Sequence, residues 1–234
     1  MKKQFFLFQQ YINVNGIDSV REANAITGGG LSTATKMPCP TYSLPAMECK
    51  TGSKLAKIEG TTCSKCYALR TYGGWYTKSR VLEPMYRRLY SLNNPQWTNA
   101  MIFLMKHFRL AFFRWHDSGD IQNLKHLDNI CKIATAVPDC KFWLPTTEHE
   151  MIKKYWNLQG RIPLKELYPN LCIRLSAIDI DQPPPIELAR ELGVTVSNTS
   201  INNPTCPAHE QYNYCRSCRH CWDNNEEQVT YLLH

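Results

Sequence analysis

The sequence predicts a single α/β domain over residues 1–234, with parallel βα units that form a partial (βα) barrel-like core. Two observations predict this class. Apolar stretches of strand length alternate with amphipathic stretches of helix length, and turn-forming residues and most cysteines gather on either side of them. The prediction divides the domain into an irregular cysteine-containing N-terminal segment (1–76), the βα core (77–200) and an irregular cysteine-rich C-terminal segment (201–234).

The N-terminal segment shows little sustained periodicity. Its apolar run at residues 5–8 is too short for a signal peptide, so we expect a short strand or a docking segment there. Three consecutive glycines at 28–30 and several prolines favour turns in the rest of the segment. Beyond it, apolar residues at helical spacing predict helices over 78–92 and 97–107.

The core is expected to alternate strands with helices from residue 110 onward. Buried strands of parallel sheets are short, nearly continuous apolar runs, and the helices between them carry one apolar face. Strands connected in this way pair in parallel, with helices on both faces of the sheet. The expected strands are 110–115, 140–144, 171–175 and 194–196, and the expected helices are 123–137, 148–158 and 185–192.

Polar residues follow the expected strands, at the edge where parallel α/β sheets gather functional groups. Strand alternation places Arg114 and His116 on one face, and a nearby carboxylate would fix the tautomer of His116 for acid–base chemistry. The structural alternative is a rim of ion pairs in which Asp120 caps the helix that begins near residue 123. The candidates are Arg114, His116, Asp117 and Asp120 for catalysis and Glu148 and Ser176 for cofactor binding, with Arg174 as a lesser candidate for the same cleft.

Four cysteines near the C-terminus follow the pattern Cys206-x8-Cys215-x2-Cys218-x2-Cys221. Two overlapping C-x-x-C steps bring three thiolates into one tight turn, and the cysteine of the preceding loop can close the site. An iron–sulfur cluster needs four thiolates in such a compact arrangement. Zinc would accept the same four ligands, with neighbouring histidines as further donors. A disulfide-bonded knot is the third interpretation.

The N-terminal cysteines follow the pattern Cys39-x9-Cys49-x13-Cys63-x2-Cys66. All four could hold one closed cluster. Alternatively, Cys49, Cys63 and Cys66 hold three irons of a 4Fe–4S cluster and leave the fourth iron open, just as catalytic zinc sites keep one position free. In a third interpretation Cys39 and Cys49 are ordinary buried thiols.

Composition limits the class of protein. Eleven cysteines cannot all pair, and a chain of this size without a signal sequence is not expected to depend on disulfides, so clustered cysteines favour metal in a cytoplasmic protein. A net charge of +7 is compatible with nucleic acid as a partner, although no long basic run supports it. No apolar run reaches the roughly 20 residues that a membrane-spanning helix needs, so no membrane contact is expected.

The most distinctive motifs of the chain are Tyr42-Ser43-Leu44-Pro45-Ala46, Glu48-Cys49-Lys50-Thr51-Gly52, Cys63-x2-Cys66-Tyr67-Ala68-Leu69, Arg114-Trp115-His116-Asp117-Ser118-Gly119-Asp120 and Cys215-x2-Cys218-x2-Cys221-Trp222-Asp223. This combination resembles the phage-borne "gene product 88" family. The resemblance implies a phage or prophage origin, action in the host cytoplasm and cysteine-bound metal. It implies no particular reaction.

The pair Cys63-x2-Cys66, followed by Tyr67 and Ala68 at the entry to a run of βα units, is also similar to the end of the radical S-adenosylmethionine (SAM) motif, C-x3-C-x2-C. The matching first cysteine is Cys49, with thirteen residues between it and Cys63. This resemblance implies that three cysteines hold a 4Fe–4S cluster and that SAM binds the open iron through its amino and carboxylate groups.

Three functions are consistent with these observations. The first is a phage-type iron–sulfur protein with two clusters, one of them open as in a radical-SAM-like enzyme that acts on an unknown substrate. The second is a non-catalytic electron-transfer or nucleic-acid-binding protein with closed clusters. The third is a zinc-stabilised α/β protein.

Overall fold

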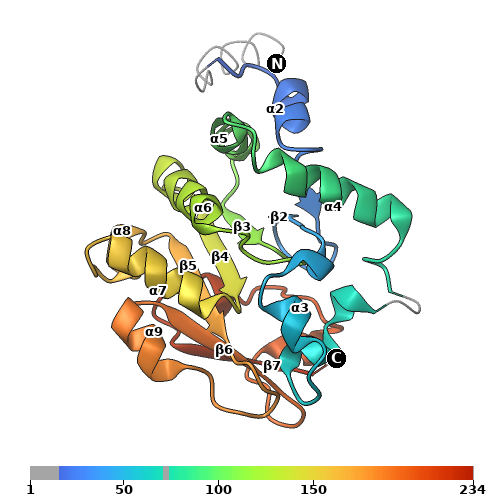
Figure 1. Cartoon of the computed structure of the whole chain (residues 1–234), viewed down its shortest axis with the longest axis vertical. Helices are drawn as coiled ribbons and strands as arrows, with labels where there is room; N and C mark the ends of the chain where they lie inside the picture. Colours follow the sequence, from blue (N-terminus) through green and yellow to red (C-terminus); the bar gives the residue numbers. More distant parts are fainter. Residues whose placement is uncertain (1–15, 71–73, 234) are drawn as a thin grey trace.

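The computed structural model describes residues 16–70 and 74–233 and shows a mixed α/β fold built on one seven-stranded sheet. The strands lie side by side in chain order (Figure 1). The first two pair antiparallel, and each later strand is parallel to the one before it. The strands are β1 (Ser32–Thr33), β2 (Pro40–Tyr42), β3 (Phe112–Trp115), β4 (Lys141–Thr146), β5 (Leu171–Ser176), β6 (Thr195–Ser200) and β7 (Gln228–Leu232).

All five expected helices are present, with ends that differ from the expected ones by a residue or so. None of the helices in the described part of the chain is long and apolar enough to cross a membrane. The five expected helices are α4 (Ser79–Ser91), α5 (Trp97–His107), α6 (Leu124–Ala136), α7 (His149–Leu158) and α9 (Ile186–Leu192). Three short helices are additional: α2 (Val20–Ile26), α3 (Gly52–Leu55) and α8 (Leu164–Leu167).

The four strands expected from apolar runs are confirmed as β3, β4, β5 and β6. Strands β1 and β2 are not among the expected elements, because two or three residues carry no readable alternation. Strand β7 is also additional, and it pairs with β6 from Val196 opposite Gln228 to Ser200 opposite Leu232. The C-terminal segment is therefore partly sheet and not wholly irregular. The element expected at residues 5–8 lies outside the described residues.

The two faces of the sheet are covered by different parts of the chain. Helices α6, α7 and α9 run along one side of the sheet (Figure 1). In β3, Phe113 and Trp115 are fully buried in the main core with Trp97 of α5. Because side chains alternate along a strand, Phe112 points to the opposite face, where it packs against Trp222. The C-terminal segment therefore forms the second cover of the sheet.

Candidate functional site

A pocket opens at the carboxyl ends of β2, β3, β4 and β5, where the sequence predicts that polar residues gather. Its empty volume is about 670 Å³, part of it open to solvent. Ser176 lines this pocket, whereas Glu148 does not. The other predicted residues that line it are Arg114, His116, Asp117 and Asp120, together with the cysteines Cys49, Cys63 and Cys66.

Cys63 and Cys66 lie in and directly after a short 3₁₀ helix, η2 (Thr62–Lys65). The Thr61 side chain caps this helix by accepting a backbone hydrogen bond at 3.1 Å. Thr61 also forms an antiparallel bridge with Asp179, which follows β5. These contacts hold the C-x-x-C pair at the carboxyl end of the sheet.

Glu148, which lies beside the pocket, holds the loop that carries Cys49. The Glu148 carboxylate accepts hydrogen bonds from the Thr51 N–H at 2.7 Å and from the Thr51 hydroxyl at 2.8 Å. Gly52 follows, and a Cβ atom at this position would lie 3.4 Å from Cys63 Sγ and 3.8 Å from Cys49 Sγ. The glycine therefore leaves space between the two thiols, and Glu148 positions the loop without lining the pocket.

The thiols of Cys49 and Cys63 are protonated when no cation is present. Burial raises the pKa of Cys63 to about 12, and the neighbouring Cys66 and Asp120 add to the rise. The pKa of Cys49 is raised further, again mainly by burial. Coordinated cysteines are thiolates, so a bound metal would displace these protons.

Asp120 is the most firmly fixed carboxylate of the pocket. Its oxygens accept hydrogen bonds from the Thr146 hydroxyl at 2.7 Å and from the Thr147 N–H at 2.9 Å. Burial raises the pKa of Asp120 to about 6, although these hydrogen bonds oppose the rise. The expectation that Asp120 caps the next helix is wrong, because the Asn123 side chain accepts the capping hydrogen bond of α6. Asp120 instead joins the ends of β3 and β4.

Asp117 is tied to β2 and to the segment that follows the cysteines. Its carboxylate accepts hydrogen bonds from the Thr41 hydroxyl at 2.9 Å, the Ser43 hydroxyl at 2.6 Å and the Tyr76 hydroxyl at 2.8 Å. The Tyr67 hydroxyl donates to the Asp117 carbonyl. The sequence prediction missed these four partners, because they lie far from Asp117 along the chain. Only the membership of Ser43 and Tyr67 in the distinctive motifs hinted at them.

His116 has a φ angle of 52°, which ends the alternation of β3. Its ring packs against the helix side, 5.2 Å from the ring of His126 in α6, whereas Arg114 lies over the ring of Trp143 on the opposite face. The expectation that Arg114 and His116 share a face is therefore wrong. In the described residues neither ring nitrogen of His116 has a hydrogen-bond partner, so the expected carboxylate contact is absent too. Burial, with His126 and Arg114 nearby, lowers the pKa of His116 well below 6.5, so the ring is neutral.

Arg114 lies between this pocket and the C-terminal cysteines. Its guanidinium is 4.2 Å from the centre of the Trp143 ring, and one terminal nitrogen is 3.2 Å from Met37 Sδ. It lines the pocket. Burial raises the pKa of Cys39 to about 12 and also raises the pKa of Cys215, and the charge of Arg114 opposes both rises. The same cation therefore acts on both groups of cysteines.

The C-terminal cysteines are attached to β7. The Cys206 N–H donates at 2.9 Å to a β7 carbonyl, and Cys221 Sγ lies 3.2 Å from the Tyr231 hydroxyl oxygen. The Cys218 N–H donates to the Cys215 carbonyl at 3.0 Å, which closes the first C-x-x-C turn. These contacts hold the cysteine segment against the second face of the sheet.

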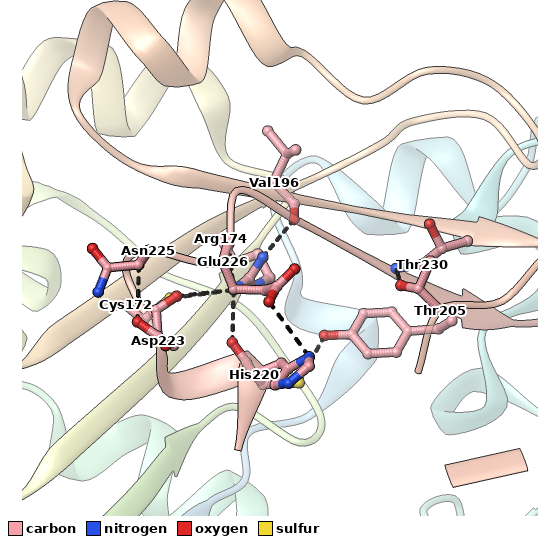
Figure 2. Close-up of polar contacts among 11 residues, drawn as sticks. Cys172, Arg174, Val196, Thr205, His220, Asp223, Asn225, Glu226 and Thr230 are labelled. Atoms are coloured by element: carbon pink, nitrogen blue, oxygen red, sulfur yellow. Dashed lines mark hydrogen bonds and ion pairs between the residues drawn. The ribbon is translucent and has the colours of Figure 1, made fainter. Parts of the chain in front are cut away.

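Arg174 fastens the same segment to the sheet (Figure 2). Its side chain is fully buried, and it donates to the carbonyls of Val196 at 2.7 Å, His220 at 3.0 Å and Glu226 at 3.2 Å. The expectation that Arg174 belongs to the strand-end cleft is wrong, because it points toward the C-terminal segment. Sequence gives no signal for this role, because the accepting carbonyls are backbone groups.

Cys39 lies with the C-terminal cysteines and away from the other N-terminal ones. It is buried just before β2 in a cluster with Trp143, Trp222 and Cys221, and Cys206 packs against the same cluster. It does not line the strand-end pocket. The structure therefore brings together three of the four N-terminal cysteines.

All eleven cysteines are free thiols, so the chain contains no disulfide-bonded knot. Cys131 and Cys140 lie in the main core, as expected of structural thiols, and Cys172 Sγ lies 3.4 Å from the Thr195 hydroxyl. Across residues 16–70 and 74–233, no group of three or more His, Cys, Asp or Glu side chains is placed to hold a single metal ion.

Comparison with known proteins gives one family. No curated protein and no solved structure matches the chain. The family model described as "Gene product 88" matches residues 17–224, a span that contains every cysteine and every residue named above for the pocket. The chain therefore belongs to the gene product 88 family, the phage family that its motifs resemble.

Proposed function

We propose that this chain is a phage iron–sulfur protein in which Cys49, Cys63 and Cys66 hold a 4Fe–4S cluster whose fourth iron faces the strand-end pocket. One observation carries the proposal: these three cysteines line a single pocket with the polar groups that follow four parallel strands. Three thiolates with one open position let a metal centre bind a further ligand.

The residues of the pocket suit a cluster better than a single ion. Around tetrahedral zinc, with bonds of about 2.3 Å to sulfur, thiolates lie about 3.8 Å apart, and the described residues contain no such ion-sized group of three ligands. A cluster of several irons and sulfides needs its thiolates farther apart, around a cavity. Gly52 supports this interpretation, because it keeps the space between Cys49 and Cys63 free of a side chain.

The pocket suits a small ligand with amino and carboxylate groups, and SAM is the ligand that we propose. A reduced cluster supplies one electron to a ligand at its open iron. The half-buried guanidinium of Arg114 provides the positive charge for a carboxylate, and Asp117 and Asp120 provide acceptors for an ammonium group. His116 is neutral and has both ring nitrogens unpaired, so it can donate to or accept from the same ligand.

We propose a second cluster at the C-terminal cysteines, within a partial (βα) barrel-like core that works in the host cytoplasm. The sequential order of the parallel strands supports the partial barrel, because that order is the one a βα barrel uses. The alternatives are zinc at the C-terminal group, and closed clusters in an electron-transfer or nucleic-acid-binding protein. Metal analysis separates zinc from iron, and the SAM assay described below separates an open cluster from closed ones.

Anaerobic purification with an absorption spectrum and iron, sulfide and zinc quantitation tests the proposal. We expect a brown protein with about eight irons per chain, as two 4Fe–4S clusters require. Replacing Cys49, Cys63 and Cys66 together by alanine should remove about half of that iron, whereas Cys131→Ala, a core thiol, should retain it. A colourless, zinc-loaded protein prepared without oxygen would refute the iron–sulfur assignment.

The enzyme part of the proposal has its own test. The reduced protein is incubated with SAM, and 5′-deoxyadenosine is measured, with the triple cysteine variant as the control. Product from the wild-type chain alone supports an open iron. If the wild-type cluster forms but SAM neither binds nor is cleaved, the protein is an iron–sulfur protein without this activity.

A further inference from the structure

Cys39 lies beside the C-terminal cysteines, although it belongs to the N-terminal part of the chain. It directly precedes β2, and its side chain is 7% exposed within the cluster that contains Cys221 and contacts Cys206. A backbone hydrogen bond outside that cluster also joins the segment before β2 to the C-terminal cysteine segment. In it, the Cys215 N–H donates to the Lys36 carbonyl at 3.1 Å. Two parts of the chain that are remote in sequence are thus held together at this point.

From this placement we propose that Cys39 is a ligand of the C-terminal metal centre, together with Cys206, Cys215 and Cys218. The proposal rests on the second centre proposed above but changes its ligand set, since the sequence pattern alone assigns Cys221 as the fourth ligand. A tetrahedral zinc or a 4Fe–4S cluster takes four thiolates, and five thiols gather here.

The hydrogen bonds of the two competing thiols decide between them. The two thiols are equally buried, each 7% exposed, but Cys221 Sγ lies 3.2 Å from the Tyr231 hydroxyl oxygen. Cys39 has no side-chain hydrogen-bond partner among the described residues, so its thiol is free to bind a metal. Cys221 is therefore the thiol that already has a side-chain partner, and Cys39 is the one with an environment suited to a ligand.

The charges around Cys39 suit an anionic centre. The Arg114 guanidinium lies 4.2 Å from the Trp143 ring centre, and the Arg219 guanidinium lies 5.1 Å from the Phe112 ring centre. Both rings belong to the Cys39 cluster, and no carboxylate among the described residues forms an ion pair with either arginine. A centre of metal-bound thiolates would place its negative charge beside both of these cations.

The test uses a chain in which Cys49, Cys63 and Cys66 are alanine, so that all bound metal reports on the C-terminal centre. Cys39→Ala, Cys221→Ala and Cys140→Ala are each added, and iron, sulfide and zinc are measured after anaerobic purification. We expect Cys39→Ala to lose nearly all the metal, whereas Cys221→Ala and Cys140→Ala keep it. Cys140 is a matched control because it is another fully buried thiol.

Alkylation provides a second readout that does not require a variant to fold. At urea concentrations at which Cys140 of the metal-loaded chain reacts with iodoacetamide, Cys39 should stay protected together with Cys215, and a chelator should remove that protection. Metal retained by Cys39→Ala, or an equal loss in Cys221→Ala, would overturn the assignment of Cys39. If the starting chain binds no metal while the wild type keeps an iron–sulfur spectrum, the C-terminal centre is refuted and the N-terminal one stands.

Discussion

Replacing Arg174 by methionine is expected to release the C-terminal segment from the sheet. The Arg174 guanidinium is fully buried and donates to the carbonyls of Val196, His220 and Glu226 at 2.7, 3.0 and 3.2 Å. Methionine fills a similar volume but donates no hydrogen bond, so these buried carbonyls lose a charged donor. The segment that carries the C-terminal cysteines should then detach first.

The size of the effect follows from these contacts. A hydrogen bond that involves a charged group contributes about 1.5–3 kcal/mol, and removing one member of a buried charged network costs about 3–5 kcal/mol. We expect a loss of about 3–5 kcal/mol in the free energy of unfolding, out of the roughly 5–15 kcal/mol of a typical domain. For a chain of this size each kcal/mol lowers Tm by about 2–4 °C, so Tm should fall by about 6–20 °C.

Thermal unfolding of the metal-free, reduced protein, followed by circular dichroism, measures this change. The matched control is Arg190→Met, since the Arg190 side chain pairs with Glu227 at 2.8 Å but is 58% exposed. Solvent screens such a pair, so the control should change Tm little. An Arg174 variant that unfolds at the same temperature as the Arg190 variant would refute the role of Arg174 as the attachment of the segment.

Three further predictions concern the pocket. Gly52→Ala places a methyl group 3.4 Å from Cys63 Sγ, so the iron content of the N-terminal cluster should fall several-fold, while Ser53→Ala in the same short helix retains it. Asp120→Asn removes a carboxyl whose pKa burial raises from 3.8 to about 6. Because the folded state holds that proton more tightly, the wild type should lose about 3 kcal/mol relative to the variant as the pH rises from about 3 to about 7. Melts at both ends of this range measure the difference, and a difference independent of pH would contradict it. Tyr76→Phe removes the donor 2.8 Å from the Asp117 carboxylate and should cost about 1.5–3 kcal/mol in urea unfolding. Tyr90→Phe, with a 69% exposed side chain, should cost almost nothing, and equal losses in the two variants would exclude the Asp117 contact as the cause.

Local periodicity was sufficient to predict the helices and the central strands. The apolar runs that became β3 to β6, and the amphipathic stretches between them, each contain enough residues for a period to be read. The parallel topology followed from their alternation, and with it the pocket at the strand ends. Asp117, Asp120 and Ser176 line that pocket because the carboxyl ends of parallel strands meet at one edge.

Other parts of the structure could not be predicted, because they depend on features that the periodicity of the sequence does not contain. The positive φ angle of His116 turns its ring to the helix side, and a period of two cannot foresee such a change. Cys39 was grouped with Cys49 because the two are near in sequence, yet β2 carries the chain between them from one cysteine group to the other. Strand β7 was missed because irregular chain and short 3₁₀ helices precede it, in place of the helix that marks a βα unit.

The backbone hydrogen bond between Cys215 and Lys36 has a consequence for biosynthesis. At about 5–20 residues per second, a ribosome needs roughly 10–40 s to add the chain that separates these residues. During that interval Cys39 lacks its C-terminal neighbours and the edge of β6 lacks its partner strand β7, because contacts of such high sequence separation form late. The nascent protein can therefore complete its strand-end pocket before the opposite face of its sheet is covered.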